Sequence, residues 1–267
     1  MQTQTLPTDK IEKTVSEAQI AGWVETFHHD GFLVLHDILS PDLITDLKSD
    51  LDRALVENHE DGDGGIQLHV RMFESSRANL RLFDQEPIVT FAEKLIGTET
   101  HVVHNNAFRV QPGKGITAWH QDDAPHYLVT HGEAPTNVRL PVLLFTANYY
   151  LTDVEEPQYG PTQAIPGSHL FGQPCPPTLE GTPYEKDIVS CCGRAGSVVM
   201  FNNQVWHRGG PNLTNRVRYM SQISYARRFV GHKYFPFMNY QMPENIYTDA
   251  DPRLKRLLGF LSSGAYG

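Results

Sequence analysis

Short strand-like runs in the second half of the chain constrain its fold most strongly. From about residue 100 onward, apolar and β-branched residues gather in runs that Pro- and Gly-rich segments separate, at residues 101–110, 142–151, 197–206 and 217–226. The run at 142–151 is almost continuously apolar, which is typical of a strand covered on both faces. Several such runs with turn signals between them predict a β-sandwich or barrel.

The first hundred residues have a different, helical pattern. Residues 16–28 carry apolar side chains at helical spacing, and Asp30-Gly31 ends this predicted helix. A short strand is expected at 32–39. Ser40-Pro41 then combines a capping hydroxyl with proline at the first helical position, which predicts a second helix up to residue 55. A third, shorter helix is expected at 87–95, ended by Gly97.

Helices followed by short strands predict an α+β domain with a mainly β core. A chain of 267 residues accommodates one such domain, and no internal repeat or linker divides it. We therefore expect a single domain over residues 1–267. Within it, residues 1–13 are expected to form a frayed tail, and residues 240–267 a C-terminal extension with a short helix at 252–258.

Composition excludes several classes of partner. The net charge of −9 argues against nucleic acid, which requires a basic surface. No apolar run approaches the length of a membrane span, and the polar N-terminus does not resemble a secretory signal, so a cytoplasmic protein is expected. The three cysteines, Cys175, Cys191 and Cys192, have neither disulfide-framework nor zinc-site spacing.

The motif H-x-D occurs three times, and only one copy has the context of a metal site. His28/Asp30 lies at a predicted helix end, and the copy at residues 59 and 61 lies in a glycine- and acid-rich loop, 60–65. That loop lacks the remaining ligands of a calcium-binding loop. His120/Asp122 follows a β-like segment, where alternate residues point to the same side and can reach one ion.

A third histidine, His207, stands at the end of the apolar run 197–206, and Arg216 and Arg218 follow on the next predicted strand. Two histidines and one carboxylate can occupy one face of an iron(II) octahedron and leave the opposite face open. A guanidinium suits bidentate capture of a carboxylate. The residues alone equally allow a hydrogen-bonded histidine at the rim and two arginines in surface ion pairs.

Four ordered segments resemble the phytanoyl-CoA dioxygenase family. They are Trp-His-Gln-Asp at 119–122, Gly-Pro-Thr-Gln-Ala-Ile-Pro-Gly-Ser-His at 160–169, Gly-Ser-Val-Val-Met-Phe at 196–201, and His-x-Gly-x-x-Asn at 207–212. The N-terminal Asp-Gly-Phe-Leu-Val-Leu at 30–35 is similar as well. The resemblance covers roughly residues 17–230.

This resemblance implies a double-stranded β-helix (jelly-roll or cupin-like fold) with flanking N-terminal helices. It also implies iron(II), 2-oxoglutarate as co-substrate and O₂, with His120, Asp122 and His207 as metal ligands. Family spacing places the 2-oxoglutarate anchor eleven residues after the distal histidine, at Arg218, with Arg216 as second choice because both face the same side of a strand. The resemblance further suggests Thr162 and Asn106 beside the co-substrate.

The implied activity is oxygenation of a small molecule with release of succinate and CO₂. Because Asp122 is present, hydroxylation or hydroxylation-driven N- or O-dealkylation is expected instead of halogenation. The substrate is expected to be a small polar metabolite or a natural-product intermediate. The alternative is a jelly-roll metabolite-binding protein without catalysis. Four other histidines, His101, His104, His126 and His169, are expected to have structural or surface roles, and the oligomeric state stays open.

Overall fold

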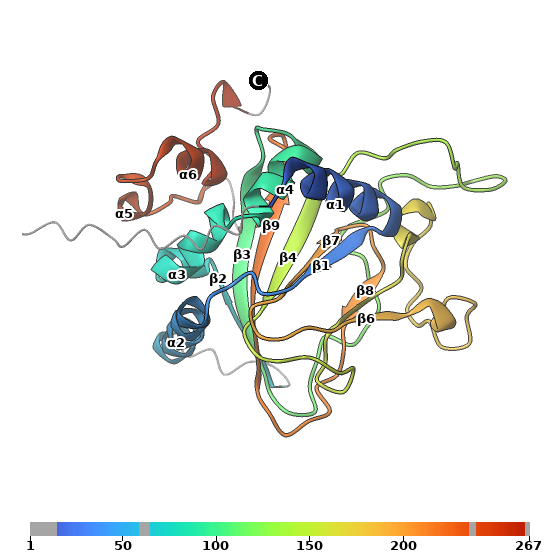
Figure 1. Cartoon of the computed structure of the whole chain (residues 1–267), viewed down its shortest axis with the longest axis horizontal. Coiled ribbons are helices and arrows are strands. Elements are labelled where there is room, and N and C mark those ends of the chain that lie inside the picture. Colours follow the sequence, from blue (N-terminus) through green and yellow to red (C-terminus); the bar gives the residue numbers. More distant parts are fainter. Residues whose placement is uncertain (1–14, 59–64, 235–238, 265–267) are drawn as a thin grey trace, which may run out of the picture.

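The computed structural model describes residues 15–58, 65–234 and 239–264. The predicted tail at 1–13, the second H-x-D copy and nearly all of the loop at 60–65 lie outside these residues. The described chain forms two facing β-sheets with helices on one side (Figure 1).

The larger sheet has six strands in the order β1-β7-β4-β9-β3-β2, and the smaller has the order β6-β5-β8. Every paired strand is antiparallel. The strands are β1 Phe32–Leu35, β2 Ile66–Val70, β3 His101–Val110, β4 Leu144–Tyr150, β5 Thr162–Ala164, β6 Val189–Cys191, β7 Val198–Asn202, β8 His207–Gly209 and β9 Arg218–Ala226.

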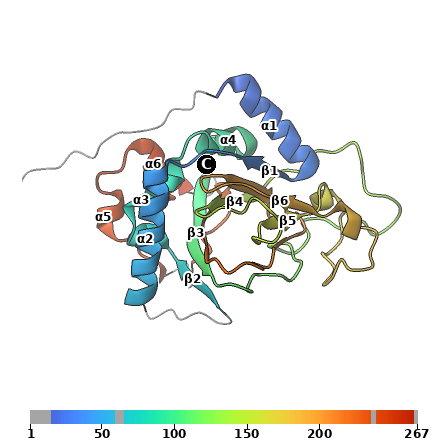
Figure 2. The ribbon, with the colours of Figure 1, turned by 60° about the horizontal axis from the view of Figure 1, so that its bottom comes forward.

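Helices cover the outer face of the larger sheet. Figure 2 shows α1 and α4 above it and α2, α3, α5 and α6 beside β3, while β5 and β6 lie across the sheet from α1 and α4. The helices are α1 Glu17–Asp30, α2 Pro41–Glu57, α3 Arg77–Arg81, α4 Ile88–Ile96, α5 Glu244–Tyr247 and α6 Pro252–Leu257, with 3₁₀ turns at Met72–Glu74, Leu82–Asp84, Ser168–Leu170 and Glu185–Asp187.

Helix ends follow local sequence chemistry. The Ser16 hydroxyl accepts a hydrogen bond from the Gln19 backbone and the Gln19 side chain accepts one in return, so a capping box begins α1. Gly31, at φ 80°, ends this helix in the left-handed conformation that glycine adopts most easily. The Ser40 hydroxyl caps α2, as its Ser-Pro pair predicts.

The strand register assigns side chains to the two faces of the larger sheet. Directly opposed residues share a face, so the inner face carries three rows that cross β3, β9 and β4. They are His104–Ser224–Thr146, Asn106–Gln222–Asn148 and Phe108–Met220–Tyr150. The outer face packs against the helices in the main core, where Phe27, Phe91, Phe145, Ile223 and Tyr225 are buried.

β4 lies between β7 and β9 in the interior of the larger sheet, and every one of its residues is buried. This explains its almost continuous apolar sequence, since helices cover one face and the smaller sheet covers the other. A separate apolar cluster, built on Trp119, Ile165, Leu179 and Trp206, packs around segments of the smaller sheet.

Some predicted boundaries were wrong. The strand expected at 32–39 ends at Leu35, and the strand expected at 197–206 ends at Asn202, after which a turn joined by Val205 N–H to Asn202 O (2.9 Å) leads into β8. The turn is needed because β7 and β8 belong to different sheets. The predicted C-terminal helix is present as α6.

Residues 123–143, which we call the excursion, connect the His120–Asp122 segment to β4 without any helix or strand. This long segment extends away from the sheets (Figure 1, right). Across the described residues, no helix has both the length and the apolarity that crossing a membrane requires.

Candidate metal centre

His120, Asp122 and His207 lie together between the two sheets, and each offers one ligand atom within 4.8 Å of the others. The Asp122 Oδ1 atom is 3.9 Å from His120 Nε2 and 3.6 Å from His207 Nε2. The two imidazole rings are 4.3 Å apart between centroids. The structure therefore brings together the three residues that the sequence proposed as ligands.

Backbone hydrogen bonds fix these positions. His120 and His207 form an isolated antiparallel bridge in which each N–H donates to the other carbonyl, at 3.0 and 2.8 Å. The Asp122 N–H donates to the Asn203 carbonyl at 2.9 Å, in the turn between β7 and β8. Two segments far apart in sequence thus hold the three side chains without any helix.

The hydrogen bonds also select the imidazole tautomers. His120 Nδ1 lies 2.9 Å from the Ala118 carbonyl, and His207 Nδ1 lies 2.8 Å from the Val205 carbonyl. Because a carbonyl only accepts, each Nδ1 carries a proton, so in the neutral ring the lone pair lies on Nε2, the atom nearer Asp122. Such second hydrogen bonds orient ligand histidines in metal sites.

Burial differs across the site. His207 is 5% exposed, and its burial lowers the pKa of the imidazole more than the neighbouring Asp122 carboxylate raises it. The His120 side chain is 37% exposed. A neutral imidazole and an open side suit a metal that must also accept small ligands.

Arg218 begins β9 and is 7% exposed. Its Nη1 donates to the Gly210 carbonyl at 3.4 Å, and its Nε has no hydrogen-bond partner among the described residues. Burial lowers the pKa of the guanidinium, and no described carboxylate forms an ion pair with it. A buried cation without a counterion is suited to an anionic ligand.

Polar side chains line the inner face between Arg218 and the triad. Thr162 is buried on β5, and its hydroxyl lies 3.5 Å from Asn148 Nδ2. Gln222 donates to Asn148 Oδ1 at 2.9 Å. Asn106, next to Gln222 in the same row, is buried, and its Oδ1 has no partner among the described residues.

Asn148 and Gln222 were missed by the sequence analysis. A polar amide within the apolar run at 142–151 was the available signal for Asn148, because a buried amide requires polar partners. For Gln222 the alternation along the strand put it on the same side as Arg218. His104 has the hydrogen-bonded role expected of it, since its Nε2 contacts Asn106 Nδ2 at 2.8 Å on this inner face.

The other predicted residues lie elsewhere. Arg216 precedes β9 and is exposed, with its guanidinium over the Tyr159 ring at 4.2 Å. His169 packs against the end of α1, where its Nε2 contacts the His28 carbonyl at 3.1 Å. His126 lies 3.6 Å from the exposed Asp123. None of these three belongs to the cluster of possible metal ligands found in the described chain.

The family model for phytanoyl-CoA dioxygenase (PhyH) matches residues 27–220, which include all three metal-ligand candidates and Arg218. The chain belongs to the phytanoyl-CoA dioxygenase family.

Curated relatives and solved structures agree with this membership. The chain is 24% identical over 239 residues to an ectoine dioxygenase of Nocardia farcinica, covering 77% of each protein. HygX from Streptomyces hygroscopicus, solved with nickel, 2-oxoglutarate and hygromycin B, superposes with a TM-score of 0.64 at 17% identity, over 82% of this chain and 90% of that one. The epimerase SnoN, solved with Fe³⁺, alpha ketoglutarate and nogalamycin RO, superposes with a TM-score of 0.65 at 19% identity. The match covers 89% of this chain and 94% of SnoN. The solved structures support the jelly-roll fold.

As a member of the phytanoyl-CoA dioxygenase family, the chain is a 2-oxoglutarate-dependent dioxygenase that uses iron and O₂. The donor set fits this requirement, because two neutral imidazoles and one carboxylate suit non-haem iron(II) and leave positions open.

Proposed function

We propose that His120, Asp122 and His207 hold the iron, and that Arg218 binds the distal carboxylate of 2-oxoglutarate. The observation that carries the proposal is the convergence of the three ligand atoms within 4.8 Å, with both Nδ1 atoms already engaged by backbone carbonyls. Hydrogen bonding thus leaves both Nε2 atoms free for a metal.

The position of Arg218 supports its role as anchor. It lies two rows away from the row that contains Asn148 and Gln222, on the same inner face of the sheet. Its uncompensated charge suits a carboxylate at the deep end of the space between the sheets. Thr162 and Asn106 would contribute a hydroxyl and an amide along that path, as the family resemblance suggests.

When bound, iron, 2-oxoglutarate and O₂ supply the oxidation of a substrate C–H bond, with succinate and CO₂ as by-products. The protein residues bind and orient the reactants and exclude water from the buried side of the site. Since Asp122 supplies a carboxylate ligand, hydroxylation or the dealkylation that follows it is the proposed outcome.

Three exposed apolar side chains support a substrate with an apolar face. Leu68 and Val70 on the edge strand β2 share the inner face with Phe108 and Asn106 through the β2–β3 register, yet they are 39% and 40% exposed. Ile116, whose carbonyl accepts from Gly209 N–H beside the bridge, is 42% exposed. Exposed apolar side chains gathered at a site commonly mark a binding surface.

Of the two substrate classes expected from the sequence, we therefore favour a natural-product intermediate over a small polar metabolite. HygX and SnoN, which share the fold, were solved with hygromycin B and nogalamycin RO. The acidic net charge of −9 supports a small-molecule substrate in place of nucleic acid. We propose a single-domain, cytoplasmic enzyme.

Anaerobic titration of the metal-free protein with iron(II) and 2-oxoglutarate tests the site through its metal-to-ligand charge-transfer absorbance. The band is expected in the wild type and in His126→Ala, a matched histidine outside the triad, and should be absent in His120→Ala. A wild type without the band would support the non-catalytic binding protein instead. Succinate release on a panel of natural products then identifies substrates.

A further inference from the structure

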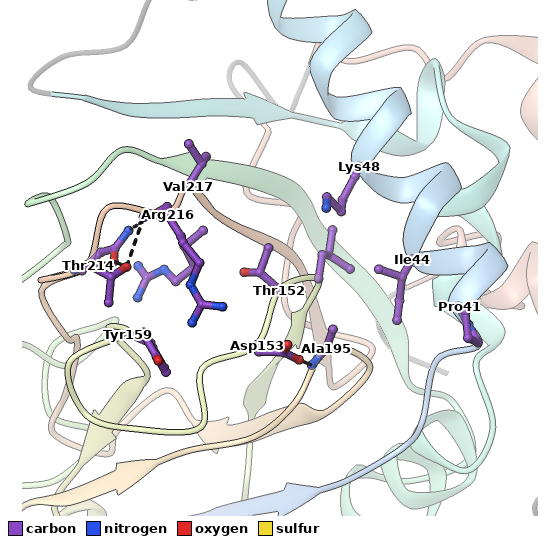
Figure 3. Close-up of a pocket in the computed structure, with 13 residues that line it drawn as sticks. Pro41, Ile44, Lys48, Thr152, Asp153, Tyr159, Ala195, Thr214, Arg216 and Val217 are labelled. Carbon is purple, nitrogen blue, oxygen red and sulfur yellow. Dashed lines mark hydrogen bonds between the residues drawn. The ribbon is translucent and has the colours of Figure 1, made fainter.

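A cavity of about 460 Å³ lies beside α2 and the segment that leads into β9 (Figure 3). Its walls come from α2, from the segment that follows β4, from the turn before β7 and from the segment that leads into β9. The triad instead lies near the start of β4, because Asp122 bonds to Asn203 and Asn202 pairs with Phe145. The cavity is therefore distinct from the metal centre.

Cations outnumber carboxylates among the lining residues. Lys48 on α2 and Arg216 line the cavity together with one acidic residue, Asp153, and Arg218, whose charge we assign to 2-oxoglutarate, borders it as well. Within the described ranges, Lys48 and Arg216 form no ion pair with any carboxylate. The Asp153 carboxylate already accepts a hydrogen bond from the Ala195 N–H at 2.9 Å.

Aromatic rings orient the two outer cations without neutralising them. The Arg216 guanidinium carbon lies 4.2 Å from the centre of the Tyr159 ring, and Lys48 Nζ lies 5.1 Å from the centre of the Tyr219 ring. Figure 3 shows Arg216 and Lys48 reaching into the space from opposite walls. A stacked guanidinium keeps its in-plane N–H donors available for an anion.

Apolar side chains complete the lining at Ile44, Leu151 and Val217. A ligand that matches both parts has an anionic head for the cations and a short carbon skeleton for the apolar wall. We propose that this cavity binds a small organic anion, either a carboxylate or a phosphate monoester, through Lys48 and Arg216, next to the proposed 2-oxoglutarate anchor Arg218. The proposal does not depend on which residues hold the iron.

Calorimetric titration of the whole protein, saturated anaerobically with iron(II) and 2-oxoglutarate, tests the cavity. The probes are glutarate for the carboxylate class, glycerol 3-phosphate for the phosphate class and inorganic phosphate for an anion without carbon skeleton. One organic probe is expected to bind. Lys48→Met and Arg216→Gln should each weaken its Kd about tenfold, the loss expected for one charge-assisted contact.

The matched control is Arg139→Gln, which removes an exposed arginine that pairs with Glu25 on α1, far from the cavity lining. Its Kd should equal that of the wild type. Lys48→Met should also keep the charge-transfer band, so that a failure of this site is separable from a failure of the metal site. Equal affinity of the organic probe for the wild type and for both cavity variants would overturn the proposal. Binding of the probe only when 2-oxoglutarate is absent would also overturn it. So would inorganic phosphate that binds as tightly as either organic probe.

Discussion

At the scale of single residues, burial distinguishes Arg218 from Arg216 as the proposed 2-oxoglutarate anchor, a choice that strand alternation left open. Arg218 is buried on the inner face, whereas Arg216 is exposed before the strand begins. Arg218→Lys should weaken 2-oxoglutarate binding about tenfold, because a lysine loses the planar fork that holds a carboxylate by two bonds. The charge-transfer titration measures this Kd.

The matching variant, Arg216→Lys, should leave the 2-oxoglutarate Kd within about twofold of the wild-type value, since that side chain is exposed and lies over the Tyr159 ring. The reverse pattern, with Arg216→Lys losing affinity and Arg218→Lys keeping it, would reassign the anchor.

Gly31 links the end of α1 to the metal centre. A Cβ atom there would lie 2.3 Å from Val205 Cγ2 and 2.5 Å from His169 Nδ1, and its φ of +80° disfavours any L side chain. Val205 supplies the carbonyl that orients His207. Gly31→Ala should lower the free energy of unfolding by about 2 kcal/mol or more in urea denaturation, and should weaken iron(II) binding.

Gly22 is the control for this substitution, since it lies within α1 and a Cβ atom there would have no heavy atom within 4 Å apart from its own helix backbone. Gly22→Ala should raise the free energy of unfolding by about 0.5–1 kcal/mol. Equal effects at both glycines would show that helix propensity alone, and not packing on Val205 and His169, decides the outcome.

At the scale of elements, the long strands were predictable and the short ones were not. The strand at β3 was predicted with both its ends, and β4 within two residues at the start and one at the end, because each is long enough to show a pattern. The strands of the smaller sheet have only three residues each, too few for any period to appear. Their positions depend on tertiary pairing.

The short strands also limited what the sequence could predict about the candidate metal centre. His120 joins the smaller sheet through one bridge with His207, so no local strand pattern marks it. The motif and the family resemblance predicted the three candidate ligands, whereas the amides of Asn148 and Gln222 became apparent only when the register placed them opposite each other.

The C-terminal helix α6 is attached by charge as well as by apolar packing. Arg253 contacts Glu86 at 2.8 Å, Glu93 at 3.1 Å and Asp84 at 3.2 Å. Arg253→Met should lower the free energy of unfolding by about 2 kcal/mol, because it removes the cation shared by three partly buried carboxylates, of which Glu93 keeps a second partner in Arg256. Chemical denaturation measures the difference.

Lys255, on the same helix, forms no ion pair with any described residue and gives the control. Lys255→Met should change the free energy of unfolding by less than about 0.5 kcal/mol. A loss in Lys255→Met as large as that in Arg253→Met would argue against the carboxylate network as the cause.

At the scale of the whole molecule, buried histidines make stability depend on pH. Burial lowers the pKa of His101 and of His169 to about 4. Between that value and the unfolded value of about 6.5, the unfolded chain takes up protons that the folded chain does not, so acidification favours unfolding. From pH 7 to pH 5, each histidine should lower the free energy of unfolding by about 1–2 kcal/mol in metal-free protein.

Urea denaturation at the two pH values measures this change. His169→Gln should make the loss of unfolding free energy between pH 7 and pH 5 smaller by about 1–2 kcal/mol, the contribution of one buried histidine. His29→Gln, at a side chain that is 88% exposed, should leave this loss as in the wild type. A wild type equally stable at both pH values would contradict the expected protonation of the unfolded chain.

The excursion at 123–143 has a consequence for how such an enzyme diversifies. It starts directly after Asp122 and ends at the buried strand β4, so both its ends are fixed on the sheets. Gln204 holds its first residues, through bonds from His126 N–H at 2.8 Å and to the Ala124 carbonyl at 3.2 Å. A segment fixed at both ends and free of sheet pairing in between tolerates changes of length and composition. Recombination between relatives at these two anchor points would exchange the whole segment as a module and leave the strands that carry His207 and Arg218 unchanged.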